Sequence, residues 1–437
     1  MWPKGAVDSA AGVSRSHFDV LVVGAGSSGA AAAAFLAEAG LAVVCVERRA
    51  LAEAGARWVN GVPRAAFAEA GVELPGEGES FGRPAPFHLV APSGRACVRE
   101  HDVIDVDMRR LVARLQERAA RAGAELRERV RVTRRDGAHV MTSAGPIEAR
   151  YIIDASGLAG ARLLGQPAVE RDDLCAAAQQ VHEVVDRDAA RAFFDEHDVR
   201  EGEILGLVGL AGGFSVLNVR IHPGGATMGI LTGSIPSLGF ASGKAMLDEF
   251  VASQPWIGAR IFGGSGAIPL RRSHDRLADD RVALLGDAAC QVFPAHGSGV
   301  GAGMIAARLL ATTLASGGTL RDYEVAWQRR HGGLNAFFDV FRRWNQAVDA
   351  ATLGQVIGLG LVDESTLRAG IDQVLPPVDA RAIASKLRVL AGQPALAARI
   401  ATTAARSALV HTLYRNYPRR ADRVATWARA VDWVLGA

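Results

Sequence analysis

The chain has 437 residues, a formal net charge of +3 and a hydrophobic fraction of 49%, which together describe a globular protein with a large core. Its basic residues are scattered, so the composition disfavours a nucleic-acid-binding protein. No apolar run reaches the length of about 20 residues that a transmembrane segment needs. The four cysteines form no close pair, which disfavours a metal site or a disulfide framework. We expect a disordered leader over residues 1–16 and a cytoplasmic location, with peripheral contact to a membrane as the alternative.

A glycine-rich turn follows the first apolar run of the chain, residues 18–23. Gly24, Gly26 and Gly29 allow a tight turn, a close approach of phosphates and close packing of helix against strand, in that order. Ser27 and Ser28 complete the turn, and the alanine-rich stretch 30–37 predicts a helix. The N-terminus of that helix would offer free N–H groups to a pyrophosphate, so the turn predicts a dinucleotide site.

A second predicted strand, residues 41–46, ends at Glu47. A carboxylate at this position can accept hydrogen bonds from the ribose hydroxyls of the dinucleotide, and it would repel a 2′-phosphate. We therefore expect Glu47 and the adjacent Arg48 to contact the cofactor.

A second glycine-rich signature lies far along the chain and indicates which dinucleotide is bound. The apolar strand 282–285 ends in Gly286 and Asp287, and a glycine-rich loop over 297–303 leads into an apolar helix. The Asp287 carboxylate could bind a ribityl hydroxyl, and the helix N-terminus could stabilise a reduced flavin ring. The signature therefore predicts FAD. The expected contacts in this part of the chain are Gly286, Asp287, Pro294, Gly297, Gly299, Val300 and Gly301.

Together these motifs resemble the flavoprotein superfamily of para-hydroxybenzoate hydroxylase, geranylgeranyl reductases and flavin-dependent halogenases. The segments 151–157 and 266–271 place the resemblance nearest the geranylgeranyl reductase branch, and it covers about residues 17–330. It implies that Asp154 contacts the cofactor, and that Arg109 does so in place of the arginine that the superfamily carries where this chain has Met108. The chain lacks the lysine and the Trp-x-Trp motif of tryptophan-type halogenases, which disfavours an ordinary halogenase.

The order of these segments predicts an α/β fold with a Rossmann-type FAD-binding domain made from two separated pieces, residues 17–170 and 276–325. Alternating apolar runs between them predict an inserted antiparallel-sheet substrate domain over 171–275. Helical periodicity predicts a helical C-terminal region over 326–437.

Three residues outside the cofactor motifs are candidates for the reaction site. His296 precedes the glycine-rich loop; a solvent-facing loop residue is the simpler interpretation, and proton donation to reduced flavin or substrate is the alternative. Trp58 and Asn60 follow the ribose-binding strand and could line the substrate site, with simple core packing as the alternative for Trp58.

These features predict an FAD-dependent oxidoreductase that acts on a lipophilic or aromatic small molecule. Reduction or dehydrogenation of a carbon–carbon bond is the leading hypothesis, and a monooxygenase that uses NAD(P)H and O2 is the main alternative. An atypical halogenase, a non-redox flavin cyclase and a flavoprotein with a structural cofactor remain as further alternatives. Electrons would come from NAD(P)H or from a separate flavin or ferredoxin reductase.

Overall fold

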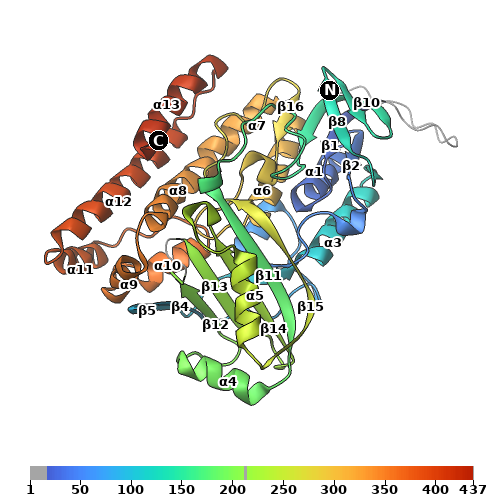
Figure 1. The fold of residues 1–437 in the computed structure, drawn as a ribbon. Helices are drawn as coiled ribbons and strands as arrows, with labels where there is room; N and C mark the ends of the chain where they lie inside the picture. Colours follow the sequence, from blue (N-terminus) through green and yellow to red (C-terminus); the bar gives the residue numbers. More distant parts are fainter. Residues whose placement is uncertain (1–16, 211–213, 437) are drawn as a thin grey trace.

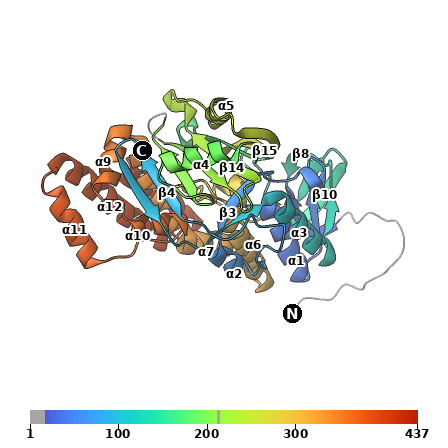
Figure 2. The same cartoon turned by 90° about the horizontal axis from the view of Figure 1, so that it is seen from below.

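The computed structural model describes residues 17–210 and 214–436, and the leader expected over residues 1–16 lies outside this part. The described chain is a mixed α/β protein with two large sheets and a helical C-terminal region, which confirms the predicted fold class (Figure 1). Seen from below, the first sheet and the C-terminal helices lie at opposite ends of the molecule (Figure 2). No helix in the described part is both long and apolar enough to span a membrane.

The first sheet has a parallel core and an antiparallel extension. Its strand order is β7-β2-β1-β10-β9-β8, and β16 pairs with β10 on the other side. β1, β2, β7, β10 and β16 pair in parallel, whereas β8 and β9 add a meander to β10. The strands are β1 His17–Val23, β2 Val43–Val46, β7 Glu125–Arg127, β8 Val132–Asp136, β9 His139–Thr142, β10 Gly145–Asp154 and β16 Val282–Leu284.

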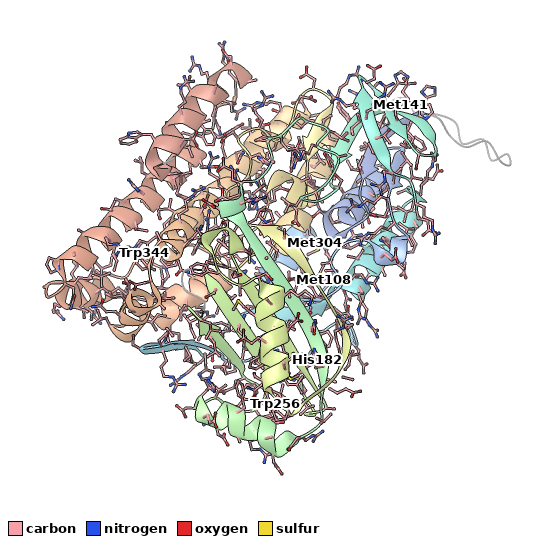
Figure 3. All side chains as sticks on the ribbon, viewed as in Figure 1. Met108, Met141, His182, Trp256, Met304 and Trp344 are labelled. Carbon is pink, nitrogen blue, oxygen red and sulfur yellow. The ribbon has the colours of Figure 1, made fainter. Side chains whose placement is uncertain are left out.

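Helices from three distant parts of the chain cover this sheet: α1 Ser27–Glu38, α3 Met108–Arg121 and α6 Val300–Ala315. α1 packs against both α3 and α6, and its run of alanines from residue 30 to 34 is fully buried. Small side chains let the helices approach closely, which explains why this helix is so rich in alanine. Met108 of α3 and Met304 of α6, both labelled in Figure 3, belong to the same apolar core. The neighbouring helices are α2 Arg64–Ala70 and α7 Leu320–Trp327.

The second sheet has the order β15-β11-β14-β13-β12-β4-β5 and is antiparallel except where β12 pairs with β4. Helices α4 Arg187–Glu196 and α5 Gly243–Ser253 contribute to the apolar core on one face of it. The strands are β4 Phe87–Ala91, β5 Gly94–Val98, β11 Leu174–Val184, β12 Ile204–Val208, β13 Ser215–Ile221, β14 Thr227–Ser234 and β15 Ile257–Pro269. A separate two-stranded ribbon is formed by β3 Val59–Pro63 and β6 Val103–Asp107.

One segment belongs to a different part of the fold than the sequence analysis expects. Residues 87–98 fall within the range assigned to the cofactor domain, yet they form the β4–β5 hairpin at the edge of the second sheet. The reason is a parallel pairing of β4 with β12, more than 100 residues further along the chain. A local alternation of apolar residues cannot specify such a distant partner.

The C-terminal region consists of helices that extend away from the first sheet (Figures 1 and 2). A π-helical turn at Gln328–Gly332 joins α7 to α8. The helices are α8 Gly333–Gln346, α9 Ala350–Gly358, α10 Glu364–Ile371, α11 Ala380–Leu390, α12 Pro394–Arg415 and α13 Val424–Leu435. Short 3₁₀ turns occur at Leu51–Glu53, Arg171–Asp173, Pro236–Leu238, Gly286–Ala289 and Ala421–Arg423.

A buried polar network fastens these helices to the rest of the protein. The Arg272 guanidinium lies 3.1 Å from the Tyr414 hydroxyl and 2.9 Å from an Asp432 carboxylate oxygen, and the Arg272 backbone N–H donates to Asp339 at 3.0 Å. Although burial opposes it, the Arg342 and Arg343 guanidinium groups lower the pKa of Asp339. The network fixes the position of α8, α12 and α13, because a buried charge is stable only with its partners in place.

Candidate functional site

The glycine-rich turn after β1 has the close packing that its sequence predicts. Gly24 has φ +101°, and a Cβ at this position would lie 2.5 Å from the Ala155 carbonyl oxygen. A Cβ on Gly29 would lie 1.9 Å from the Gly24 carbonyl oxygen. Gly26 precedes the first residue of α1, Ser27, and no side chain of the described part caps this helix. The N–H groups at the start of α1 therefore remain available for an anion.

Glu47 lies at the carboxyl end of β2, beside this turn. Its carboxylate accepts hydrogen bonds from the backbone N–H groups of Ala25, at 3.0 Å, and Arg49, at 3.1 Å. The side chain is buried and held against the glycine turn, where a ribose would have to lie. The neighbouring Arg48 is exposed and forms no ion pair within residues 17–210 and 214–436.

The second glycine signature meets the first one directly. Cβ atoms on Gly286 and Gly303 would lie 2.5 Å and 2.1 Å from the Ser28 Oγ atom. Ser28 thus occupies the space between the turn after β16 and helix α6, and it brings the two predicted motifs together. Residues more than 250 positions apart in the sequence therefore form one cradle.

Asp287 is the acidic group of this second half. Asp287 is exposed, and no hydrogen bond to its carboxylate is formed by the described residues. The protein that surrounds it on most sides desolvates the carboxylate and raises its pKa to about 6. An acid that is accessible and unpartnered is free to accept a hydrogen bond from a ligand hydroxyl.

Helix α6 begins at Val300 after Gly299, and none of the described side chains caps it. A Cβ on Gly299 would lie 2.9 Å from a Val292 methyl group, and a Cβ on Gly301 would lie 2.8 Å from Ala66 Cβ. Gly297 has φ +81°, and Pro294 is buried in the preceding loop. The loop is thus packed too tightly for larger residues, and its uncapped N–H groups form a second anion-stabilising helix end.

These groups fit FAD. Two uncapped helix N-termini, at α1 and α6, suit a pyrophosphate and the electron-rich edge of a flavin ring, respectively. Glu47 and Asp287 supply carboxylates at the two positions where ribose and ribityl hydroxyls would need acceptors. A Cβ at Gly24, Gly286 or Gly303 would lie 2.1 to 2.5 Å from a neighbouring protein atom, so the close packing of the cradle depends on these glycines.

Asp154, which the resemblance implies as a cofactor contact, makes its hydrogen bonds within its own loop. This carboxylate is fully buried and accepts hydrogen bonds from the Leu163 N–H, at 2.9 Å, from the Ser156 N–H, at 3.2 Å, and from the Ser156 hydroxyl. Its acceptor capacity is therefore used within its own loop, and it shapes the site without facing it. The return of Leu163 to Asp154 depends on the path of the loop, which the motif does not encode.

Arg109, the other residue that the resemblance implies as a cofactor contact, pairs with groups of the protein. Its guanidinium donates to Asp107, at 3.0 and 2.6 Å, and lies over the Phe262 ring with 3.6 Å to the ring centroid. The bidentate ion pair neutralises the charge of the side chain, and the aromatic stack covers one flat face of its guanidinium group. Arg109 therefore ties α3 to β15 of the second sheet.

Gln116 is a residue of this region that the sequence analysis does not single out. It is buried on α3 and donates to the carbonyl oxygens of Ala25, at 2.9 Å, and Leu51, at 3.1 Å. It thereby holds the glycine turn in place from behind. The available signal was a polar residue on the apolar face that contains Leu111 and Leu115.

A cavity of about 680 Å³ adjoins the loop before α6. At this end it is lined by Trp58 and Asn60, the two predicted substrate-site residues, and by His296, Gly297 and Ser298. The Ser298 hydroxyl donates to the Gly61 carbonyl oxygen at 3.0 Å, which joins the loop to β3. The structure therefore brings the three candidate reaction-site residues to one wall of one cavity.

The cavity continues past the second sheet into the C-terminal helices. Phe214 and Leu231 line it at the sheet, and Phe337, Phe341 and Trp344 line it from α8. Figure 3 labels Trp344, which lies well away from Met304 of the cofactor part. Further residues of the helical wall are Val356, Ile357, Leu361, Leu390, Ile400 and Thr403. The sequence analysis finds helices here but no part of the site.

His296 lines this cavity and is exposed there, although protein lies around the ring. Desolvation lowers the pKa of the imidazole to about 4, against the smaller effect of backbone hydrogen bonds that include Gly370. Its ring lies 5.0 Å from the Phe293 ring, and Phe293 in turn lies 4.5 Å from Phe338. At neutral pH His296 is therefore an uncharged imidazole in aromatic surroundings, which carries one N–H proton.

The comparisons with known proteins agree with this site. Residues 17–173 match a family model described as an FAD binding domain. The digeranylgeranylglycerophospholipid reductase 1 of Methanopyrus kandleri is 30% identical over 319 residues, which cover 67% of this chain and 79% of that protein. The enzyme of the same name from Methanoculleus marisnigri is 27% identical over 352 residues, covering 72% and 82%.

Solved structures share the fold. A geranylgeranyl bacteriochlorophyll reductase-like protein from Thermoplasma acidophilum matches with a TM-score of 0.68 at 18% identity, covering 89% of this chain and 99% of that one. The halogenase PltM matches with a TM-score of 0.61 at 16% identity, covering 96% and 95%. Sequence identity separates these relatives, because it is 30% for the Methanopyrus reductase and 16% for the halogenase. The chain belongs to the family of FAD-dependent oxidoreductases that includes the digeranylgeranylglycerophospholipid reductases.

Proposed function

We propose that this protein reduces carbon–carbon double bonds in an unsaturated lipophilic chain, such as an isoprenoid lipid. The observation that carries the proposal is the cavity, which runs from the loop before α6 to the C-terminal helices. An apolar chain threaded along it would present one double bond at a time to the cofactor end. The names of the archaeal relatives favour the same reaction.

The residues at the cofactor end support a hydride transfer beside an apolar wall. Trp58 packs against β15, where a Cβ on Gly266 would lie 3.2 Å from the indole ring, and it forms a rigid apolar wall. His296 is the titratable group of the loop before α6 that reaches the cavity, and it is neutral. Bound FAD, once reduced, would supply the hydride equivalent. His296 would then hold the proton that the second carbon of the double bond requires.

The electron source belongs to the proposal as well. The chain has one dinucleotide turn, and the structure uses it together with the second glycine signature for a single cradle. We infer that NAD(P)H visits only transiently, or that a separate flavin or ferredoxin reductase delivers the electrons.

An anaerobic experiment tests the proposal. The FAD-loaded protein is reduced chemically without oxygen and then mixed with an unsaturated isoprenoid lipid, while the flavin absorbance is followed. We expect the lipid alone to restore the oxidised flavin spectrum. If the spectrum returns only when oxygen is admitted, and a hydroxylated product forms, the protein is a monooxygenase and the proposal is wrong.

A further inference from the structure

Exposed apolar side chains gather in one short segment of the C-terminal region. Twelve large apolar side chains are exposed among the described residues, and five of these lie between residues 374 and 387. Val378 is 91% exposed and Leu387 is 62% exposed. Scattered exposed leucines need no explanation, but a cluster of this kind marks an interaction surface. The five residues are Val374, Leu375, Val378, Ile383 and Leu387.

The segment consists of a loop and helix α11, which lies at the outer edge of the helical region (Figure 2). Ile383 and Leu387 are one helical turn apart and both exposed. Lys386 and Leu390, also one turn apart, line the cavity. At 3.6 residues per turn, Leu390 and Lys386 lie next to Ile383 and Leu387 around the helix. The exposed apolar surface, which we call the α11 face (residues 374–388), therefore borders the cavity wall.

Positive charge is in excess among the groups of the α11 face that form no ion pair in the described part of the chain: Arg381 and Arg388 against Asp379. Arg381 and Arg388 are exposed and form no ion pair with any residue that the structure describes. Asp379 is the sole acidic residue between 374 and 399. Its carboxylate caps α11 by accepting from the Arg381 N–H, at 2.7 Å, and the Ala382 N–H, at 2.9 Å. Lys386 is already paired with Asp363 at 2.8 Å.

We propose that the α11 face docks on the surface of a lipid bilayer that carries anionic headgroups. The five apolar side chains would enter the interface, while Arg381 and Arg388 would lie at the level of the phosphates. A symmetric contact between two copies of the chain fits less well, because Asp379 is the one acid of this face and could pair only one of the two arginines of each copy. Docking here would turn the helical end of the cavity toward the lipid.

Docking on a bilayer rests on the proposed function in one respect, namely that the substrate is a lipid. Membrane binding can be measured without substrate or electron donor. The experiment is cosedimentation of the FAD-loaded full chain with vesicles of phosphatidylcholine, with or without phosphatidylglycerol. We expect binding to the phosphatidylglycerol vesicles and much weaker binding to the neutral ones.

Two variants locate the surface. Leu387→Asp should weaken vesicle binding by at least about tenfold, because it replaces an inserted apolar side chain by a charge. Val185→Asp is the matched control, since Val185 is 63% exposed but lies far from α11, after β11. Removing the charges in Arg381→Gln and Arg388→Gln should each weaken binding to anionic vesicles by about fivefold.

Three outcomes would overturn the proposal: no cosedimentation of the wild type with anionic vesicles, equal losses in Leu387→Asp and Val185→Asp, or a change of mass in solution for Leu387→Asp with vesicle binding intact. The last result would make the α11 face an interface between copies. Turnover of a detergent-dispersed substrate separates the two proposals. If wild type binds vesicles but reduces no lipid in detergent, the proposed function fails while docking stands.

Discussion

Ser28 and Gly303 stand in direct contact across the cofactor cradle, since a Cβ on Gly303 would lie 2.1 Å from the Ser28 Oγ atom. The contact joins the N-terminus of α1 to the first turns of α6, which are about 270 residues apart in the chain. The geometry of both predicted FAD motifs therefore depends on a small residue at each of these two positions.

Gly303→Ala should weaken FAD binding by at least about tenfold, because the added methyl group forces α1 and α6 apart. FAD affinity is measured by titration of the FAD-free protein. The matched control is Gly392→Ala, where the added Cβ meets nothing within 4 Å. The double variant Ser28→Ala/Gly303→Ala should recover most of the affinity, and equal losses in the single and double variants would contradict the packing argument.

The Asp287 carboxyl should make FAD affinity depend on pH. Desolvation raises its pKa to about 6, so in the FAD-free protein it is protonated below that pH and becomes a full acceptor only above it. We expect FAD to bind more tightly as pH rises from 5 to 7, with a midpoint near 6. Asp287→Asn should flatten the profile and lower the affinity at pH 7. An unchanged profile in Asp287→Asn would assign the pH dependence to another group.

His274 should reduce the stability of the protein in mild acid. It is buried, and desolvation is the largest of the effects that lower its pKa to about 4. Between about pH 6.5 and pH 4 the unfolded chain binds a proton that the folded chain does not, so stability falls as pH falls through this window. The slope from this group is about 1.4 kcal/mol per pH unit. Denaturant unfolding should show a shallower slope for His274→Gln, whereas the exposed control His139→Gln should keep the wild-type slope.

The proton held by His296 leads to a kinetic prediction. Because its pKa is about 4, the imidazole stays neutral above pH 6 and should cause no inflection in kcat/KM between pH 6 and 8. His296→Gln should lower kcat by about a hundredfold, within the usual range for a lost proton donor, while FAD remains bound. An unchanged kcat would show that His296 only forms part of the cavity wall.

Thr403 offers a test of the helical end of the cavity. Thr403→Phe would fill part of the cavity from α12, whereas Thr402→Phe adds the same ring at an exposed neighbouring position. We expect Thr403→Phe to lower kcat/KM for a long isoprenoid lipid by about tenfold or more, and to leave a short-chain analogue within about twofold. Steady-state kinetics with the two substrates measure the difference. An equal loss of kcat/KM with both substrates would show that the long lipid chain does not occupy this end of the cavity.

The close packing of the two glycine turns could be predicted from the sequence because its determinants are local. The turns at Gly24–Gly29 and Gly286–Asp287 each carry their own backbone requirements, and the structure places both in one cradle. Asp154 and Arg109 behave otherwise. Each has the residue type and chain position of a cofactor contact, but Asp154 binds the Leu163 N–H of its own loop, and Arg109 stacks on Phe262 of β15.

The substrate half of the site could not be derived in this way. Its wall combines Trp58, Phe214, Phe341 and Leu390, which come from four separate parts of the fold. The phenylalanines of α8 form a helical apolar stripe that looks the same whether it packs against a core or faces a cavity. Only the tertiary arrangement of α8–α12 shows that the stripe encloses a space.

The most direct test of the central claim is the composition of the lipid after one anaerobic turnover of the reduced, FAD-loaded protein with an unsaturated isoprenoid lipid. The account predicts that each flavin oxidised yields one saturated bond, seen by mass spectrometry as the gain of one pair of hydrogens. A lipid recovered unchanged from protein that is fully loaded with reduced FAD would contradict it.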